Sequence, residues 1–315
     1  MQPSQRYDRA IHERLPHMKV ARDVPLAPHT TFRIGGPADL FVDATTPDEL
    51  ADAVLAARES ETPYFVLGRG ANVLVGDRGF RGVVIRNAVE GIEFLSGNRV
   101  CAGAGVDVYP DLIEATVEHG LGGLHHFVGI PGTVGGALWQ NLHFLSPAPA
   151  RERTLFIAEV LDSAEILTEE GRRSSVDAAY FEFGYDQSIL HHRDDIVLSA
   201  TFRLHEEAVA TLRRVMAENL EWRAARHPDL ASRPSAGSIF QKIEEVGAGR
   251  LIDQCGLKGH VHGRAAIFEK HANIIVNLGG ATATEVRHLM DLARDTVQRE
   301  TGYVLVPEIT LVGEF

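Results

Sequence analysis

Short apolar runs followed by glycine-marked or polar turns recur along the chain from about residue 40 onward. Runs of this length, bounded by glycine, asparagine or aspartate, are typical of buried strands. Other segments place apolar residues three or four positions apart, which is the spacing of an amphipathic helix. The two patterns alternate, so the chain is expected to mix helices and strands.

Strands are expected in two groups. The first group lies at 40–42, 64–67, 73–75, 83–85, 100–102, 163–168 and 196–204. The second group lies near 238–241, 273–277 and 304–312.

Helix starts are clearest at Thr46-Pro47-Asp48-Glu49, where a threonine N-cap precedes a proline and two first-turn acids. Residues 1–27 are expected to form a short amphipathic helix and an extended lead-in. Further helices are predicted at 46–58, 108–118, 205–227, 249–254 and 284–301.

The chain is long enough for several domains, because 315 residues exceed what one core usually fills. The grouping of strands and helices divides it into an N-terminal lead-in and three units. We expect boundaries that give the segments 1–27, 28–88, 89–206 and 207–315.

Residues 129–141, GIPGTVGGALWQN, carry the strongest candidate chemistry. Four of them are glycines (Gly129, Gly132, Gly135 and Gly136), which suits positive φ angles or a close backbone approach. Unpaired backbone N–H groups at such a place suit an anion such as a pyrophosphate. The alternative is a tight buried turn without a ligand. Three further glycine-marked turns lie upstream beside strand-like runs, and this repetition favours the ligand.

Composition and net charge limit the classes of partner and the compartment that we expect for this protein. The net charge of −12 argues against nucleic acid or an anionic membrane surface as the main partner. Cys101 and Cys255 are expected to be buried free thiols in a reducing compartment, with no disulfide and no metal site. No signal peptide or membrane-spanning run is visible, so we expect a cytoplasmic protein.

Eight stretches together resemble a known family. They are TFRIGGPADLFV (31–42), LGRGANVLVGDRGFRGVVI (67–85), AGAGV (102–106), GIPGTVGGALWQN (129–141), SAGSIF (235–240), AGRLIDQCGLKG (248–259), EKHANIIVN (269–277) and PEITLVGE (307–314). In this order they resemble the UDP-N-acetylenolpyruvoylglucosamine reductases, flavoenzymes that complete UDP-N-acetylmuramate for peptidoglycan. The chain looks like the shorter of the two subtypes.

The resemblance implies an α+β fold. Segments 28–88 and 89–206 would form the two parts of an FAD-binding fold of the para-cresol methylhydroxylase type. Segment 207–315 would be a C-terminal α/β substrate-binding domain. The G-x-G-x-x-G fingerprint of the Rossmann fold is absent.

The resemblance also implies noncovalent FAD, with NADPH as the hydride donor. The residues expected to contact FAD are Gly35, Gly36, Gly68, Arg69, Gly70, Ala71, Asn72, Val73, Gly129, Gly132, Thr133, Gly135, Gly136, Ala137 and Asn141. Turn capping is the alternative role of Asn72 and Asn141. No flavin-attachment motif is recognisable, although His125 and His126 lie close to the glycine stretch and leave attachment there open.

Three residues are expected at the reacting centre. Ser238 would donate the proton, Glu308 would place a carboxylate in the pocket, and Tyr185 would hydrogen-bond the substrate. Their alternative roles are a backbone-bonded hydroxyl, a surface glutamate and a core aromatic. Lys242, His271 and Asn273 are expected to contact the substrate, UDP-N-acetylglucosamine enolpyruvate. The sequence leaves the oligomeric state open, although a monomer is favoured, and no metal is expected.

The chain departs from the family pattern at three places. Asp186 follows Tyr185 where the family has an arginine for the substrate carboxylate; Gln241-Lys242 and residues 141–153 also differ. We expect Lys242 to supply the missing cation, paired with Asp186, while Arg193 and Arg250 are the other candidates. The alternative function is a flavin-binding homologue with a changed substrate, acting as another oxidoreductase or a binding protein. A cofactor-free structural protein would leave the glycine turns without a ligand.

Overall fold

The computed structural model describes residues 3–243 and 246–315. The chain divides into two compact units built from interleaved segments. The first unit comprises Met1–Val20, Val42–Arg69 and Val84–Arg223. The second comprises Ala21–Phe41, Gly70–Val83 and Ala224–Phe315. The four segments expected from the sequence remain a proposal.

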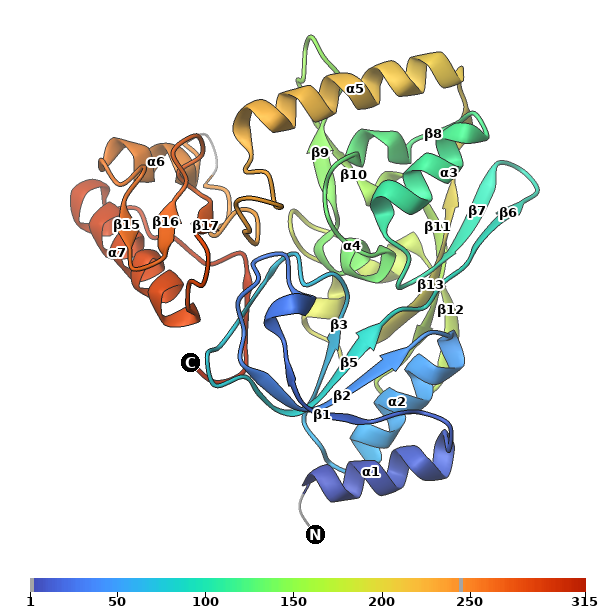
Figure 1. Ribbon diagram of the computed structural model, residues 1–315. Coiled ribbons are helices and arrows are strands. Elements are labelled where there is room, and N and C mark those ends of the chain that lie inside the picture. The colour runs from blue at the N-terminus through green and yellow to red at the C-terminus, as the bar shows by residue number, and fades with distance from the viewer. Residues whose placement is uncertain (1–2, 244–245) are drawn as a thin grey trace. The chain divides into compact units, whose positions relative to one another are not determined.

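Figure 1 labels the helices, and all of them except the one at Val134–Gln140 lie in segments where the sequence predicts a helix. They are α1 (Pro3–Arg14), α2 (Pro47–Glu59), α3 (Ile113–Glu118), α4 (Val134–Gln140), α5 (Val209–Arg226), α6 (Ala248–Gln254) and α7 (Ala283–Thr301).

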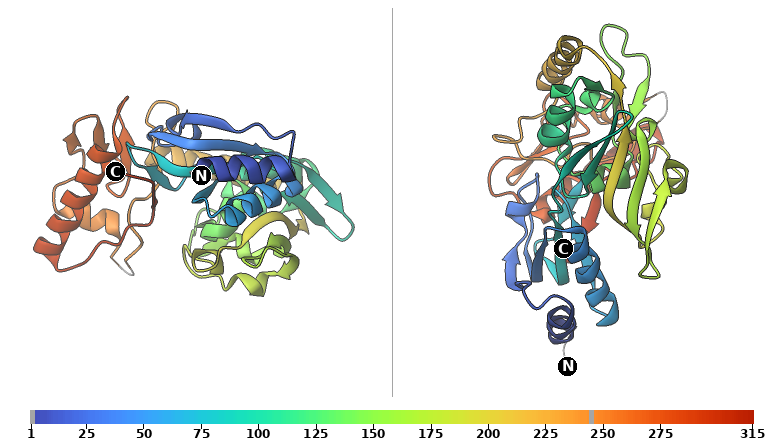
Figure 2. Two further views of the ribbon diagram at one scale, coloured as in Figure 1. Left: turned by 90° about the horizontal axis from the view of Figure 1, so that it is seen from below. Right: turned by 90° about the vertical axis from the view of Figure 1, so that its right-hand side faces the viewer.

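The first unit is built on an antiparallel sheet with the strand order β12-β11-β13-β7-β6. Strands β11 and β13 run side by side in the right-hand view of Figure 2. The strands are β12 (Arg173–Asp177), β11 (Leu161–Leu167), β13 (Ile196–Arg203), β7 (Arg99–Gly103) and β6 (Ile92–Leu95). Two small antiparallel pairs accompany this sheet, namely β8 (Leu121–Gly122) with β14 (His205–Glu206) and β9 (His143–Leu145) with β10 (Thr154–Phe156).

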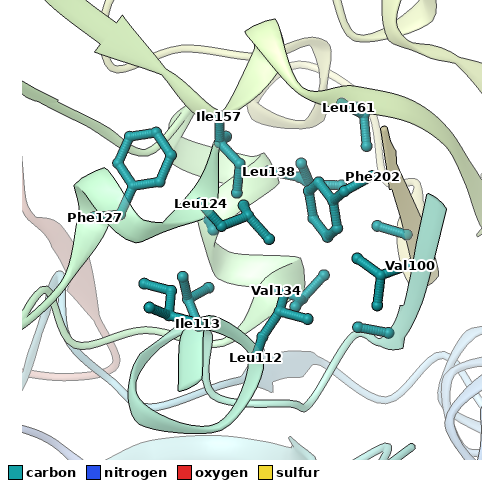
Figure 3. Packing of buried hydrophobic residues seen from close by; sticks show 14 of the residues in the cluster. Val100, Leu112, Ile113, Leu124, Phe127, Val134, Leu138, Ile157, Leu161 and Phe202 are labelled. Carbon is teal, nitrogen blue, oxygen red and sulfur yellow. The ribbon is translucent and has the colours of Figure 1, made fainter. Parts of the chain in front are cut away.

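Apolar side chains from the sheet and from the short helices fill the core of the first unit (Figure 3). Val134 and Leu138 of α4 and Phe202 of β13 are each fully buried in this cluster. Burying a side chain of this size stabilises a fold by about 1.5–3 kcal/mol. The core therefore holds α4 firmly on the sheet.

At the N-terminal end, α1 packs beside α2 in both figures. The predicted start of α2 is confirmed, because Thr46 and Glu49 form a reciprocal capping box with Pro47 at the first position. Arg14 of α1 bridges Asp52 and Glu59 of α2. Strand β3 (Tyr64–Leu67) follows.

A four-stranded sheet has the order β1-β2-β5-β3. Its strands β1 (Ala21–Pro25), β2 (Pro37–Ala44) and β5 (Phe80–Asn87) surround the predicted runs at 40–42 and 83–85. The boundary between the units falls inside β2 and β5.

The second unit packs α6 and α7 with a three-stranded antiparallel sheet of order β15-β16-β17. These strands are β15 (Val261–His262), β16 (Ala265–Ile267) and β17 (Ile275–Asn277). In the same unit, β18 (Thr310–Val312) runs parallel to β4 (Val73–Val75).

Several expected elements were wrong in type or length. No strand forms at 238–241, where Gly237 has a φ of +76° and only isolated bridges occur at Ser238 and Phe240. The last strand is restricted to Thr310–Val312, since Pro307 lacks the N–H that a strand ladder needs.

Two helix starts also lie later than expected. Helix α3 begins at Ile113, because Tyr109 is extended before Pro110. Helix α5 begins at Val209, because residues 205–206 form β14. Cys101 and Cys255 are free thiols as expected, but they are half-buried where full burial was predicted.

Asp77 ties the turn after β4 to the first turn of α7 within the second unit. Its carboxylate accepts hydrogen bonds from Ala283 N at 2.7 Å, Thr284 N at 2.9 Å and Thr284 Oγ1 at 2.6 Å. Burial alone would raise the pKa of Asp77, but the hydrogen bonds from Thr284 and Ala283 outweigh it and hold this pKa below its ordinary value.

We predict that Asp77→Ala lowers the free energy of unfolding at pH 7 by about 1 kcal/mol, the usual effect of losing a helix cap. A carboxylate with a lowered folded pKa stabilises the fold above its unfolded pKa, and this stabilisation disappears as the pH falls through the folded value. The difference between variant and wild type should therefore shrink below about pH 4. Urea unfolding at pH 7 and pH 3 measures it.

The matched control is Asp291→Ala on α7, whose carboxylate makes an exposed ion pair with Arg294 at 3.0 Å. Exposed pairs of this kind contribute about 0.2–1 kcal/mol. Equal effects of the two substitutions at pH 7 would contradict the capping role of Asp77.

Candidate active site

Two of the predicted glycine stretches meet inside the first unit. A Cβ added to Gly68 would lie only 2.5 Å from Thr133 Oγ1, so an alanine at this turn would clash with the start of α4. A cavity of about 520 Å³ opens beside this contact. It is lined by Gly68, Arg69, Arg86, Asn87, Ala88, Glu90, Gly91, Ile92, Gly105, Val106, Asp107, Asp111 and Thr133. Its volume is in the range of small-molecule sites.

Backbone hydrogen bonds fix the wall of this cavity. Val134 N donates to Val106 O at 2.9 Å, and Gly135 N donates to Ala104 O at 2.8 Å. A Cβ on Gly135 would lie 3.2 Å from Ala104 O, so glycine permits this close approach. The first turn of α4 is therefore anchored to residues 104–106.

Gly136 differs from Gly135 because no neighbouring atom lies close enough to exclude a side chain at position 136. It is exposed, and a Cβ there would find Thr133 Oγ1 as its nearest neighbour at an ordinary 3.5 Å. The fold therefore does not require glycine at position 136. A ligand that approaches the bare start of α4 would require it.

The cavity contains charges of both signs. Arg69 lies 3.6 Å from Asp107, and Arg86 lies 2.6 Å from Asp43. Burial raises the pKa of Asp107, and Arg69 counteracts this only in part. The two arginines give the cavity groups that can bind a phosphate.

The C-terminal end of α4 holds polar atoms that need a partner. Asn141 caps the helix with a φ of +51°, and its Nδ2 donates to Gly184 O at 2.8 Å. Asn141 Oδ1 and both amide atoms of Gln140 are buried and have no hydrogen-bond partner among the described residues. Buried polar atoms in native proteins are normally satisfied, so these point to a ligand or to water. They fit the polar groups of FAD.

The predicted FAD residues Gly35, Gly36 and 70–73 lie in the second unit, whereas Gly129, Gly132 and Ala137 belong to the first. A Cβ on Gly36 would lie 2.2 Å from Asp77 O, and a Cβ on Gly35 would lie 2.9 Å from Val75 Cβ. Close packing against residues 75–77 therefore accounts for both glycines without a ligand. Asn72 Nδ2 reaches Glu308 O at 3.5 Å. A role in FAD binding for Gly35, Gly36 and residues 70–73 stays a prediction.

Ser238 and Glu308 are brought together in the second unit, although 70 positions separate them in the sequence. Glu308 N donates to Ile239 O at 2.8 Å, directly after the predicted proton donor. Asn273 holds the same segment, since its Oδ1 accepts from Phe240 N at 3.0 Å and its Nδ2 donates to Phe240 O at 2.8 Å. The amide of Asn273 thus positions the Ser238 segment.

Tyr185 and Asp186 form the tip of a tight turn in the first unit. Gly184 N donates to Gln187 O at 3.0 Å, and Asp186 has a left-handed φ of +55°. Tyr185 is 42% exposed, which is unusual for a core aromatic and contradicts that alternative role. Asp186 is only 6% exposed, and its Oδ1 lies 3.4 Å from Nδ1 of His143.

The remaining candidates for substrate contact are Arg193, His271 and Lys242. Arg193 faces Asp195 at 2.9 Å, Glu169 at 3.3 Å and Glu170 at 3.7 Å, which argues against a free substrate cation there. The ring centroids of His271 and His227 are 5.6 Å apart. Burial lowers the pKa of His271. Lys242 is exposed in the second unit, so a pair with Asp186 of the first unit stays a prediction.

The rings of His125 and His126 lie close together, with centroids 3.9 Å apart and planes tilted by 40°. Burial lowers the pKa of His125 to about 3 and that of His126 to about 4, and nearby histidines lower them further. His125 Nδ1 accepts from Gly123 N at 3.1 Å. Both rings are therefore neutral at pH 7, with His125 buried and His126 half-buried.

Residues 228–312 match the family model described as "UDP-N-acetylenolpyruvoylglucosamine reductase, C-terminal domain", and residues 38–176 match an FAD-binding domain. The chain is 34% identical over 292 residues to the UDP-N-acetylenolpyruvoylglucosamine reductase of Clostridium botulinum strain Hall, covering 93% of this chain and 92% of the relative. The chain belongs to the UDP-N-acetylenolpyruvoylglucosamine reductase family. It is therefore an FAD-containing oxidoreductase of peptidoglycan synthesis.

Two further comparisons agree. The reductase of Pediococcus pentosaceus is 36% identical over 308 residues, covering 98% of this chain and 99% of the relative. The crystal structure of the reductase from Thermus caldophilus matches with a TM-score of 0.77 at 35% identity, covering 94% of this chain and 99% of that one. The predicted resemblance and the α+β fold with its FAD-binding and C-terminal domains are confirmed.

Among the described residues, no helix is both long and apolar enough to cross a membrane. Within that same part of the chain, no group of three or more histidine, cysteine, aspartate or glutamate side chains is arranged to hold a metal ion.

Sequence reasoning missed Gln140, Asn87 and His143. Gln140 and Asn87 stand beside glycine stretches that were recognised, but a single glutamine or asparagine carries no signal of its own. His143 lies within residues 141–153, which were noticed only as a departure. Its position opposite Asp186 depends on a contact across 43 residues.

We predict opposite effects of Gly136→Ala on stability and on FAD affinity. Alanine favours a helix over glycine by up to about 1 kcal/mol, so the flavin-free protein should become more stable by about 0.5–1 kcal/mol. The added methyl group should weaken FAD binding at least tenfold. Urea unfolding and fluorescence titration with FAD measure the two quantities.

Gly249→Ala is the matched control, because Gly249 lies in α6 and its added Cβ would contact Asn273 Cβ at an ordinary 3.4 Å. This variant should retain the wild-type FAD affinity. An unchanged FAD affinity in Gly136→Ala would remove the start of α4 from the cofactor site.

We also predict that the flavin is bound noncovalently. The imidazoles of His125 and His126 are neutral, and His125 is buried, so neither ring is well placed for attachment. Acid precipitation of the yellow protein should release the flavin into the supernatant, where absorbance measures it. Flavin that stays with the pellet after washing in denaturant would contradict this prediction.

Proposed function

We propose that this protein reduces UDP-N-acetylglucosamine enolpyruvate to UDP-N-acetylmuramate, with NADPH as the reductant and FAD as the intermediary. Family membership supports the reaction type, and the glycine-lined cavity of the first unit supports the cofactor. The assembly of Ser238 and Glu308 carries the assignment of the reacting centre. We expect a cytoplasmic monomer whose partners are these two small molecules.

Reduction of an enol ether conjugated to a carboxylate needs a hydride at one alkene carbon and a proton at the other. FAD, when bound and reduced, supplies the hydride. The negative charge that moves toward the substrate carboxylate must be stabilised by nearby donors or cations. A positioned acid must then deliver the proton to the adjacent carbon.

Ser238 is the proposed acid. A serine hydroxyl is a weak acid, so it can serve only against a strongly basic enolate-like form of the substrate. The position of the Ser238 hydroxyl relative to the substrate must therefore be well defined. The Asn273 amide, bonded to both backbone groups of Phe240, and the bond from Glu308 N to Ile239 O supply this control. Glu308 and Tyr185 would contact the substrate, together with Lys242 and His271.

Asp186 supports a second candidate function. An aspartate where a substrate carboxylate should bind would repel it, since two charges about 4 Å apart interact by about 4 kcal/mol at an effective dielectric constant of 20. A flavin-dependent homologue that acts on a different substrate would avoid this repulsion. The near-complete family pattern of residues 235–314, including Ser238 and Glu308, favours the enolpyruvyl nucleotide.

We predict that Ser238→Ala spares reduction of the flavin by NADPH and slows reoxidation by the enolpyruvyl nucleotide about 10²–10⁴-fold, the usual effect of losing a general acid. The first half-reaction needs no proton from this serine, whereas saturation of the alkene does. Anaerobic stopped-flow absorbance separates the two steps.

Ser232→Ala is the control, because Ser232 is an exposed serine bonded to Asp229. It should leave both half-reactions unchanged. A normal reoxidation rate in Ser238→Ala would exclude Ser238 as the acid. A wild-type enzyme that NADPH reduces but that the enolpyruvyl nucleotide does not reoxidise would favour the second candidate function.

A further inference from the structure

Asp186 is a nearly buried carboxylate at the tip of an exposed turn, and this combination needs a physical reason. Its side chain is 5% exposed, although the preceding Tyr185 is 42% exposed. Burying a carboxylate is costly unless a cation or hydrogen-bond donors compensate it. Asp186 also adopts the left-handed φ of +55°, a conformation that aspartate and asparagine tolerate better than most residues. The turn therefore directs Asp186 inward and Tyr185 outward.

His143 is one residue that lies against Asp186. Its Nδ1 lies 3.4 Å from Asp186 Oδ1. The centroid of the imidazole ring lies 4.5 Å from the ring centroid of Tyr185 and 5.5 Å from that of Phe156. His143 pairs with Phe156 between β9 and β10, so a regular backbone ladder supports it. Aromatic rings thus flank the imidazole, and the Asp186 carboxylate lies within ion-pair distance of its Nδ1 edge without forming a hydrogen bond through Oδ1.

This arrangement fixes the direction of the second ring nitrogen. The two nitrogens of an imidazole lie on opposite edges of the ring, so Nε2 is directed away from Asp186 when Nδ1 faces it. A carboxylate on Nδ1 stabilises the protonated imidazole and selects its orientation. A protonated His143 would present an N–H donor from Nε2 beside Tyr185. An anionic group is the complement of such a donor.

The same short helix connects this group to the cavity. Helix α4 begins at the anchored turn after Thr133 and ends at Asn141, whose Nδ2 bonds to Gly184 O just before Tyr185. Its seven residues span about 10 Å at a rise of 1.5 Å per residue. The expected flavin stretch and the turn that carries Tyr185 are therefore held at a fixed separation within the first unit.

We propose that His143 binds the carboxylate of the enolpyruvyl substrate through Nε2 and that Asp186 is the positioning residue that orients and charges the imidazole. This inference rests on the proposed function. It explains how the protein can carry an aspartate after Tyr185: the cation that recognises the substrate comes from β9, and Asp186 is its counter-charge. It also makes a direct pair between Lys242 and Asp186 unnecessary.

Two substitutions of His143 distinguish substrate binding from a structural role. In His143→Gln the side-chain amide nitrogen takes the place of Nε2, so an outward donor is kept and the contact with Asp186 is lost. In His143→Asn the amide nitrogen takes the place of Nδ1, so the contact with Asp186 is kept and the outward donor is lost. A residue that only compensates the buried carboxylate would tolerate asparagine better than glutamine. Our proposal expects the reverse for the substrate KM.

We predict that His143→Asn raises the KM for the enolpyruvyl nucleotide about 10- to 100-fold, the range for losing a hydrogen bond to a charged group. His143→Gln should raise this KM several-fold less. Both variants should retain the wild-type rate of flavin reduction by NADPH. Steady-state kinetics and the perturbation of the flavin spectrum on titration with the nucleotide give the KM and the Kd.

Asp186→Asn tests the positioning role, because asparagine also tolerates the left-handed conformation and only the charge is removed. It should raise the KM about three- to tenfold in the wild-type background and have no effect in the His143→Gln background. If either variant of His143 fails to fold, this single substitution still decides, since an unchanged KM and Kd would overturn the inference. His119→Asn is the control, a ring stacked on Phe94 in the same unit, and should leave every parameter unchanged.

The outcomes separate the inference from the proposed function. An active wild type combined with normal KM and Kd in His143→Asn would overturn the inference alone. A wild type whose flavin is reduced by NADPH but not reoxidised by the nucleotide would overturn the proposed function, and the inference with it. Additive effects of Asp186→Asn and His143→Gln would remove Asp186 as a residue that acts through His143.

Discussion

The docking of α4 onto residues 104–106 is the constraint on which the rest of the candidate site depends. Two backbone hydrogen bonds, from Val134 and Gly135, hold the start of the helix against the sheet of the first unit. Glycine at position 135 makes this approach possible, and the buried side chain of Val134 secures it. The cavity wall at one end of α4 and the turn of Tyr185 at the other both take their positions from this contact.

In the second unit, a side-chain amide holds the segment that carries Ser238. Ser238 lies in a segment that forms no regular strand, because Gly237 interrupts the ladder. Asn273 replaces the missing strand partners by pairing with both backbone groups of Phe240. An irregular segment held in this way can expose a reactive hydroxyl that a continuous sheet would cover. Asn273 therefore positions the serine segment, a role that the sequence alone did not suggest.

Interactions between residues close in the sequence could be predicted from it, whereas contacts between distant residues could not. The N-cap of α2 was predictable, since Thr46 and the residues after it act only on their own helix. The glycine stretch was recognisable because several glycines stand close together. The strand expected at 238–241 was wrong, because the backbone groups of Phe240 bond to the Asn273 side chain and only isolated bridges form. The approach of Asp186 to His143 joins positions whose spacing obeys no local rule.

The interleaving of the two units has a consequence for the biosynthesis of the protein. The parallel partner of β18 and the carboxylate that caps α7 both come from residues 70–83, more than two hundred positions upstream. A ribosome therefore releases these early segments long before the residues they must contact have been made. A C-terminal fragment that starts at residue 224 would lack both partners. The second unit is thus built from three separate segments and cannot be excised as one continuous piece of chain.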